Sequence, residues 1–278
     1  MPEGDAIFRM ARTLNRALAG RTVIRFESVF PRLTRVHDDA SIVGRVVESV
    51  SAAGKHVLMR FSGDLMLRTH MRMNGSWHIY RPGERWRYPR RDMRIVVSTK
   101  DYEAVGFNIP VAEFLDEDAE ERQQDLRTMG PDLLGESFDE DEALRRIRGR
   151  ANEEIADVLL NQRIVAGIGN IYKCEVLFLS GVSPFARVSQ IEDERLRLIL
   201  RTARKYLQAN VKMRSSGIVT YAGFRRERGE GGRHYVYARA RRACRKCGTI
   251  VELRAQGPHA RLTYWCPTCQ ARSADVSS

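Results

Sequence analysis

The sequence lacks long apolar runs, and this absence restricts its class. None of its 278 residues form a stretch approaching the roughly 20 apolar residues that a bilayer span requires. Its first ten residues, MPEGDAIFRM, contain neither the basic segment nor the apolar core of a secretion signal. A hydrophobic fraction of 43% excludes wholesale disorder. We therefore expect a globular cytoplasmic protein with no membrane partner.

Cysteine is also scarce, but four of the five cysteines form a pattern. Two Cys-x-x-Cys pairs are separated by 18 residues. Two such pairs can supply the four sulfurs of a tetrahedral zinc shell. Because sulfur fills all four positions, no place remains for a reactive water, and the metal is expected to be structural. The pattern predicts one Zn²⁺ bound by Cys244, Cys247, Cys266 and Cys269.

The positive charge is concentrated in one part of the chain. Residues 187–246 contain 17 Lys and Arg against 5 Asp and Glu, a surplus of 12 that equals the net charge of the whole sequence. Solvated charge runs normally mix both signs, so a one-sided block favours a polyanionic partner. We expect nucleic acid, with an acidic membrane surface as the alternative.

The hydrophobic pattern divides the chain into two unlike halves. An amphipathic helix is predicted over 5–18. Short segments rich in Val, Ile, Phe and Tyr follow, as in a β-sandwich or barrel, at 22–29, 43–50, 55–61, 64–71, 75–80, 93–99 and 102–107. The acidic segment Glu113–Arg122 and the pair Gly130-Pro131 place a domain boundary near 120–130.

Helices are predicted beyond that boundary. Asn152 is a candidate cap for a helix ending near Gln162. Ser189 and Glu192 form a candidate capping box for a longer helix ending near Val211. The glycine- and arginine-rich stretch 214–233 indicates a loop.

The N-terminus offers a candidate nucleophile. Methionine before a small residue is usually excised, which would expose the secondary amine of Pro2. A terminal α-amine has a pKa near 8, against about 10.4 for lysine, so a useful fraction is nucleophilic at neutral pH. Glu3 follows directly and could transfer protons. Taken alone, Glu3 and Asp5 could equally favour the first turn of a helix.

Five motifs occur in the order of a known DNA-repair family. They are PEGD at 2–5, Gly54-Lys55-His56, His70-Met71-Arg72-Met73-Asn74-Gly75, Gly167-Ile168-Gly169-Asn170-Ile171-Tyr172 and the four-cysteine finger. Over nearly its whole length the chain resembles the formamidopyrimidine-DNA glycosylase and endonuclease VIII family.

The resemblance implies an α+β fold of three parts. These are an N-terminal β-sandwich domain with an N-terminal helix (1–122), a helical helix-two-turn-helix domain (129–220) and a C-terminal zinc-finger β-hairpin (235–270). The implied partner is double-stranded DNA with damaged bases or abasic sites. We expect a monomer that associates with the nucleoid when bound to DNA.

The resemblance also assigns roles in catalysis. Pro2 is similar to the family's Schiff-base nucleophile, and Glu3 to the acid that assists base release and opening of the sugar ring. Lys55 resembles a lysine that contacts phosphate and assists proton transfer; the alternative is an ordinary exposed lysine. Arg261 stands five residues before Cys266, where the family has an arginine that reaches the phosphates around the lesion, and guanidinium can hold phosphate with two hydrogen bonds.

Further positions resemble DNA contacts of the family. An enzyme that acts on C1′ within a duplex must turn the nucleotide out and fill the gap. Arg72, Met73 and Asn74 stand where the family carries void-filling residues, although a methionine at a strand end is more often part of a core. Asn170 resembles a DNA-contacting asparagine and is also a candidate helix cap.

Two departures from the family pattern bear on the substrate. Tyr102–Pro110 lacks the Arg-Phe-Gly that the formamidopyrimidine branch places opposite the lesion, and with PEGD this favours the endonuclease VIII branch. Thr128 stands where endonuclease VIII has a phosphate-binding arginine, with Arg127 as the candidate replacement.

The expected function is a bifunctional DNA glycosylase and abasic-site lyase of base excision repair. It would remove oxidised pyrimidines through a Schiff base and cut the strand by β,δ-elimination. One alternative is an enzyme directed at 8-oxoguanine and formamidopyrimidines. Another is a zinc-ribbon DNA-binding protein without catalysis, which would need none of Pro2, Glu3 and Lys55.

Overall fold

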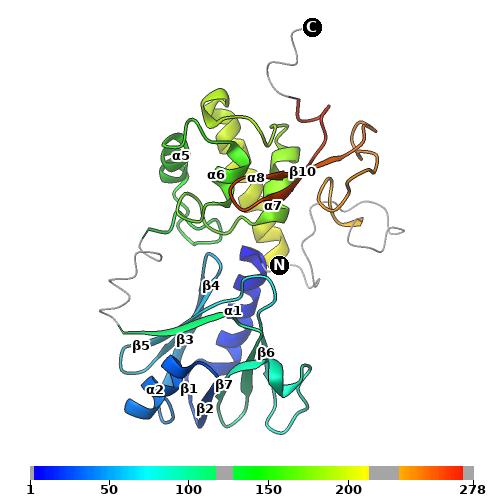
Figure 1. Ribbon diagram of the computed structural model, residues 1–278. Helices are drawn as coiled ribbons and strands as arrows, with labels where there is room; N and C mark the ends of the chain where they lie inside the picture. The colour runs from blue at the N-terminus through cyan, green and yellow to red at the C-terminus, as the bar shows by residue number, and fades with distance from the viewer. Residues whose placement is uncertain (1–2, 117–127, 213–231, 272–278) are drawn as a thin grey trace. The chain divides into compact units, whose positions relative to one another are not determined.

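The chain folds as two compact units, Met1–Thr128 and Met129–Ser278 (Figure 1). The computed structural model describes residues 3–116, 128–212 and 232–271. No helix within these ranges is long and apolar enough to cross a membrane.

Two antiparallel sheets form the first unit. One has five strands in the order β1-β3-β4-β5-β9: β1 (Arg21–Thr22), β3 (Val46–Ala53), β4 (His56–Phe61), β5 (Leu65–His70) and β9 (Val111–Asp116). The other has four in the order β2-β7-β8-β6: β2 (Arg25–Ser28), β7 (Met93–Ser98), β8 (Glu103–Phe107) and β6 (Ser76–Tyr80). Side chains of both sheets share one hydrophobic core, as in a sandwich.

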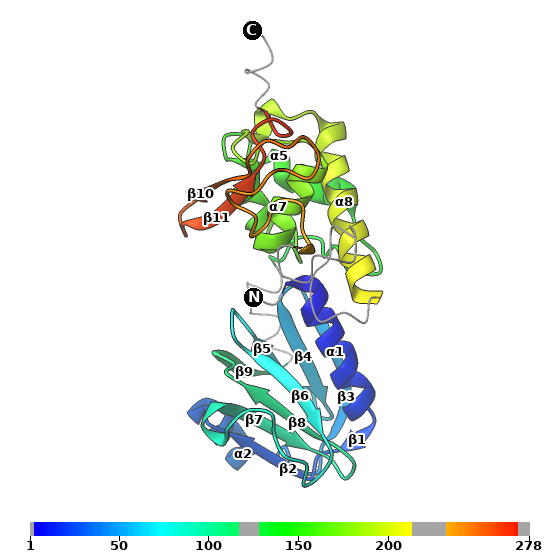
Figure 2. The ribbon, with the colours of Figure 1, turned by 90° about the vertical axis from the view of Figure 1, so that its right-hand side faces the viewer.

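The helix α1 (Gly4–Leu18) lies along β3 and β4 (Figure 2). Its apolar residues recur at helical spacing, and Ile7, Ala11, Leu14 and Leu18 are buried against the sheets, as the sequence pattern predicts. Because this face is buried along its full length, the first turn of the helix is held in a fixed place on the sandwich.

Each of the seven predicted strand segments contains a strand, but the segment 22–29 is divided. The N–H of Val23 donates to the carbonyl of Arg45, which directly precedes β3 of the five-stranded sheet, whereas that of Ile24 donates to Ser98 in β7 of the other sheet. The chain therefore changes sheets between these neighbours, which a hydrophobic pattern cannot reveal.

Two elements of the first unit have no counterpart in the sequence prediction. The helix α2 (Pro31–Asp39) begins with a proline at its first position, which is a favoured place. The strand β9 lies in the segment interpreted from its acidity as a boundary. There Glu113 forms an ion pair with Arg68 of the neighbouring strand, so an acidic residue is accommodated within a sheet.

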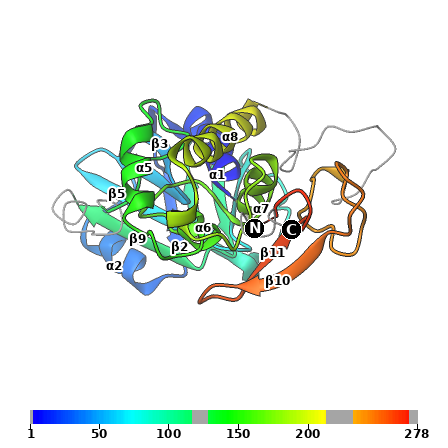
Figure 3. The same cartoon turned by 90° about the horizontal axis from the view of Figure 1, so that it is seen from above.

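The second unit consists of helices and one hairpin. The helices are α5 (Glu140–Arg148), α6 (Ile155–Leu160), α7 (Asn170–Leu179) and α8 (Asp193–Lys212). A hairpin of β10 (Glu252–Gln256) and β11 (Arg261–Trp265) lies beside α7 (Figure 3). Short 3₁₀ turns occupy Arg90–Asp92 in the first unit and Val188–Gln190 in the second.

The helix caps predicted at Asn152 and Ser189 are wrong. The helix expected to start after Asn152 is α6, whose N-cap is Glu154. Ser189 belongs to the 3₁₀ turn, where its N–H donates to Ala151, and α8 begins only at Asp193. In both cases the chain before the helix is held by tertiary backbone hydrogen bonds, which outweigh the local cap signal.

Candidate functional site

Two buried carboxyl groups stand at the first turn of α1. Glu3 is the N-cap residue, and its carbonyl accepts the N–H groups of Ala6 and Ile7 at 3.0 and 3.1 Å. Glu3 and Asp5 both have 0% exposure. Burial raises the pKa of Asp5 to about 6, against the opposing charge of Arg9, whose guanidinium is 3.3 Å away, and with a further rise from Glu3. Pro2 lies outside the described residues.

Lys55 and His70 come together where β4 begins and β5 ends. Lys55 is half-buried in the turn after Gly54, whose φ of +55° favours glycine. His56 pairs with His70 across the strands, with ring centroids 4.7 Å apart. Burial lowers the pKa of His70, and the charges of Lys55, Arg72 and Arg68 lower it further. His70 thus lies among three positively charged side chains that disfavour its imidazolium form.

His70 belongs to one of the five sequence motifs, but the sequence alone does not indicate a functional role for it. Its neighbour Lys55 is 15 positions away in the sequence, and only the pairing of β4 with β5 brings the two together. The sequence does place a histidine at the end of a predicted strand. It does not show which residue of a neighbouring strand lies beside that histidine.

The turn between β5 and β6 presents side chains to solvent. Arg72, Met73 and Asn74 are exposed, Met73 by 61%, so this methionine is not a core residue. Arg72 has a φ of +46°, and its N–H donates to Nδ1 of His70 at 3.0 Å. At Gly75 an added Cβ would lie 2.7 Å from the Met71 carbonyl oxygen. The turn therefore has a defined conformation that holds three consecutive side chains outward.

Asn170 opens α7 in the second unit, but it does not cap the helix. The N-cap is Gly169, so that prediction is wrong. The Asn170 side chain is directed instead to the hairpin, where Nδ2 donates to the carbonyl of Leu262 at 2.8 Å. The N-terminus of α7 and the strand that carries Arg261 are thereby joined.

Arg261 is the first residue of β11 and is exposed. It pairs in register with Gln256, on the far side of the turn 257–260. That turn starts with Gly257, which has a φ of +70° and lies close to Asp157 of α6. Arg261 thus stands beside the turn of the hairpin.

The four paired cysteines converge on one point. Their sulfur atoms all lie within 4.8 Å of one another, with 3.9 Å between Cys244 and Cys269 and 3.4 Å between Cys247 and Cys266. Tetrahedral zinc–sulfur bonds of about 2.3 Å require sulfur separations of about 3.8 Å. The four residues therefore fit a single metal ion of this kind.

Aromatic residues beside the cysteines pack within the unit. Trp265 meets Phe185 edge-on at 4.8 Å between ring centroids, and Tyr264 lies 5.1 Å from Tyr237. Trp265 and Tyr264 therefore contribute to the packing of this unit.

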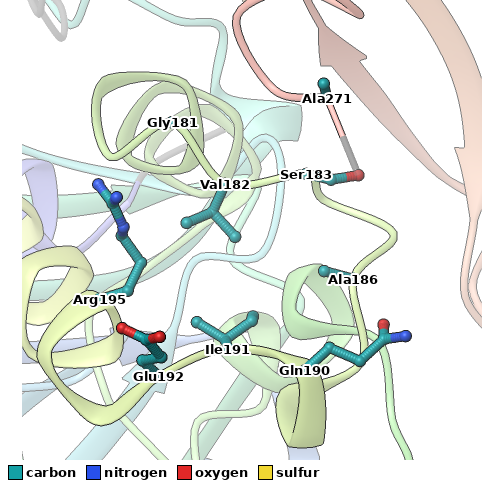
Figure 4. A pocket seen from close by; sticks show the side chains of 9 residues that line it. All are labelled: Gly181, Val182, Ser183, Ala186, Gln190, Ile191, Glu192, Arg195 and Ala271. Carbon is teal, nitrogen blue, oxygen red and sulfur yellow. The ribbon is translucent and has the colours of Figure 1, made fainter. Parts of the chain in front are cut away.

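A pocket of about 260 Å³ lies elsewhere in the second unit (Figure 4). It is lined by Arg195 and Glu192 at the start of α8 and by Ser183 after α7. None of the predicted site residues lines it, and its volume is below the roughly 300–1,000 Å³ usual for ligand sites. We assign it no role.

The predicted site residues are divided between the two units. Glu3, Lys55 and Arg72–Asn74 belong to the first, whereas Asn170, Arg261 and the cysteines belong to the second. Arg127, the candidate replacement for a missing arginine, lies outside the described residues.

Comparison with known proteins covers the whole chain. The family model described as "Formamidopyrimidine-DNA glycosylase N-terminal domain" matches residues 1–131, and the "Formamidopyrimidine-DNA glycosylase H2TH domain" matches 129–222. The "Probable endonuclease 8 2" of Streptomyces coelicolor is 41% identical over 277 residues, which cover 99% of this chain and 95% of that protein. The "DNA-(apurinic or apyrimidinic site) lyase Nei2" of Mycolicibacterium smegmatis is 36% identical, with coverage of 98% and 100%.

Solved structures agree on the fold. Lactococcus lactis formamidopyrimidine-DNA glycosylase, bound to DNA containing an abasic site, superposes with a TM-score of 0.80 at 22% identity and covers 98% of this chain and 100% of that one. With the sandwich, the helical unit and the cysteine-bearing hairpin described above, this likeness confirms the predicted α+β fold.

Proposed function

Because this chain belongs to the formamidopyrimidine-DNA glycosylase and endonuclease VIII family, we propose that it is a DNA glycosylase and abasic-site lyase of base excision repair. Its most similar named relatives above are an endonuclease 8 and an abasic-site lyase. Damaged double-stranded DNA is the proposed partner and oxidised pyrimidines are the proposed substrates, acted on by a monomer. The parts proposed are the catalytic sandwich (1–122), the helix-two-turn-helix domain (129–220) and the zinc finger (235–270).

The complete burial of Glu3 carries the proposal. Glu3 has 0% exposure, and burying a carboxyl group at the start of a helix costs solvation free energy that its interactions must offset. A binding module would gain nothing from burying a carboxyl group next to its N-terminal residue. A proton-transfer group, in contrast, benefits from exclusion of water.

The proposed reaction starts with the amine of Pro2 after removal of Met1. Its nitrogen attacks C1′ and loses its proton, the glycosidic bond breaks, and the base leaves with a proton supplied through Glu3. The C1′–O4′ bond then breaks, O4′ takes up a proton through Glu3, and a double bond forms between the Pro2 nitrogen and C1′. The resulting iminium withdraws electrons and acidifies the C2′ proton. Loss of that proton expels the 3′ phosphate, and a second elimination releases the sugar from the 5′ phosphate. Each step balances without an oxidant or a metal.

DNA contacts are proposed for residues of both units. Lys55 and Arg261 would hold phosphates near the lesion, and Arg127 and Asn170 would contact the backbone. Arg72, Met73 and Asn74 would fill the gap left by the extruded nucleotide, since Met73 already projects into solvent.

One structural zinc ion is proposed at Cys244, Cys247, Cys266 and Cys269. Thiolates are the form that binds zinc, and a bound divalent cation would favour the deprotonated form of each ligating cysteine. When bound, the metal supplies folding free energy to the finger and no chemistry at the lesion.

Borohydride trapping tests the mechanism. The purified protein, with a free Pro2 terminus verified by mass spectrometry, is incubated with abasic-site DNA and sodium borohydride. We expect a covalent adduct that is absent from Pro2→Gly. Adduct formation should persist in Arg35→Ala, which removes an exposed arginine of α2. Failure of the native protein to form an adduct would refute the Schiff base.

A panel of duplexes tests the substrate class. Thymine glycol, 5-hydroxycytosine, 8-oxoguanine and an abasic site are compared under single-turnover conditions. We expect faster release of the oxidised pyrimidines. Preference for 8-oxoguanine would establish the purine alternative, and binding without cleavage of any duplex would establish the non-catalytic one.

A further inference from the structure

The helix α7 carries two charged side chains in an otherwise apolar sequence, and both are buried. Lys173 has 1% exposure and Glu175 has 0%. Burial of a charge is costly without hydrogen-bonding partners. Glu175 accepts the backbone N–H groups of Tyr235, Val236 and Tyr237 at 2.8–2.9 Å, which ties the chain before the first cysteine pair to the helix.

Lys173 begins a chain of hydrogen bonds that ends at a carboxylate. Its Nζ donates to Oγ1 of Thr263 at 2.7 Å, and that hydroxyl donates to Oε1 of Gln256 at 2.7 Å. Nε2 of Gln256 then donates to Oε2 of Glu154 at 2.6 Å and to the carbonyl of Pro184 at 3.0 Å. Every link runs from donor to acceptor in one direction, so the ammonium group orients the hydroxyl and the hydroxyl orients the amide.

The middle of this chain lies inside the hairpin. Thr263 is in β11, two residues after Arg261, and Gln256 is the cross-strand partner of Arg261. Thr263 has 0% exposure and Gln256 has 5%, so both face the helices and neither is available to DNA. Asn170, three positions before Lys173, donates to Leu262 between Arg261 and Thr263.

The cysteines fix the other end of the hairpin. Cys266 follows β11 directly, five residues from Arg261. A two-stranded hairpin has little stability of its own, so a metal at its base does not determine the place of its turn. The hydrogen bonds that run from Lys173 to Glu154 attach the turn end of the hairpin to the helices.

We propose that Thr263 is a positioning residue, which through Lys173, Gln256 and Glu154 holds Arg261 and Asn170 as one phosphate-binding unit. The proposal rests on the proposed function, because it assigns the two residues a common DNA phosphate target. It adds three buried residues, Thr263, Lys173 and Gln256, and the partly buried Glu154, which would touch no DNA but determine where the phosphate contacts stand.

The test compares two substitutions at one position. Thr263→Val preserves the shape but removes the hydroxyl, and Thr263→Ser preserves the hydroxyl. Thr99→Val is the matched control, since Thr99 is equally buried and its hydroxyl makes two hydrogen bonds in a turn of the first unit. Dissociation constants are measured by fluorescence anisotropy with a duplex carrying a tetrahydrofuran abasic analogue. Zinc content and thermal unfolding are measured on every variant.

We expect Thr263→Val to bind the abasic duplex about tenfold more weakly while retaining its zinc, since loss of one buried hydroxyl bonded to a charged group has an effect of this order. Thr263→Ser should bind the duplex within about twofold of the native protein, because it keeps the hydroxyl. Thr99→Val should lower thermal stability without changing affinity. In an Arg261→Ala background, Thr263→Val should add less than twofold, because the arginine that it positions is gone.

Three results would overturn the proposal: native affinity in Thr263→Val, failure of Thr263→Ser to restore affinity, or a full tenfold effect in the Arg261→Ala background. Failure of the proposed function is distinguishable, because the native protein itself would then bind the abasic duplex no more tightly than an undamaged one.

Discussion

Replacing Asp5 by asparagine should stabilise the first unit above about pH 6 and leave its stability unchanged below about pH 4. Asp5 is fully buried, and its pKa is raised from 3.8 to about 6, mainly by burial. The folded protein therefore holds a proton that the unfolded chain releases between these two values. Stability falls as the pH rises through this window, and the loss is complete above the folded-state pKa.

The size of the effect follows from the two pKa values. Their difference, about 6 less 3.8, is about 2.2, and each unit corresponds to about 1.4 kcal/mol. The ionised carboxyl group thus costs the folded state ~3 kcal/mol at pH 8. Asparagine mimics the neutral carboxyl group and removes this cost, which is already net of the opposing attraction of Arg9.

Urea denaturation at constant ionic strength between pH 4 and 8 provides the measurement. Trp77 and Trp86 belong to the first unit and Trp265 to the second, so a Trp265→Phe background makes fluorescence report the first unit. Asp101→Asn, which removes an exposed carboxyl group, is the control for charge alone. An Asp5→Asn protein with the pH dependence of the native one would refute the reasoning, as would a loss of stability at pH 8.

Three further predictions concern the proposed DNA contacts. Lys55→Gln should raise the pKa of His70, measured by NMR, because a positive charge that disfavours the imidazolium is removed; a fall would contradict the placement of Lys55. Gly257→Ala should destabilise the hairpin by about 1–3 kcal/mol, since the residue has a positive φ and an added Cβ would lie 2.2 Å from Oδ1 of Asp157. Thermal unfolding tests this, with Gly248→Ala as a control of similar φ but open surroundings. Cys247→Ser should lower zinc content and DNA affinity together, and full affinity in a zinc-free variant would exclude the finger from binding.

Local patterns in the sequence were sufficient for much of the fold. The apolar spacing of α1 and the seven strand segments follow from periodicity, because burial of one face imposes that period on the residues themselves. The cysteine spacing likewise predicted that four sulfurs would meet. Family resemblance added the order of the parts, which no local pattern contains.

The helix caps, and the point at which the chain passes from one sheet to the other, could not be predicted from local sequence patterns. Asn152, Ser189 and Asn170 each carry a good cap signal, yet in each case a neighbour held by tertiary hydrogen bonds or by backbone geometry takes the position. The acidity of β9 was misleading because the partner that accommodates Glu113 is on another strand. These are outcomes of contacts between segments distant in sequence.

The sequence by itself determined which residues are candidates for the site: Pro2 and Glu3 at its start, Lys55, Arg261 and, as metal ligands, four cysteines. Only the tertiary structure decided their surroundings. It buried Glu3 and Asp5, set His70 beside Lys55 and exposed Met73. It also joined Lys173 to Glu154 through the interior of the hairpin. The physical reason is that the burial and the hydrogen bonds of a residue depend on side chains and backbone groups from segments distant in sequence. The spacing of residues along the chain does not show which of these groups will lie beside it.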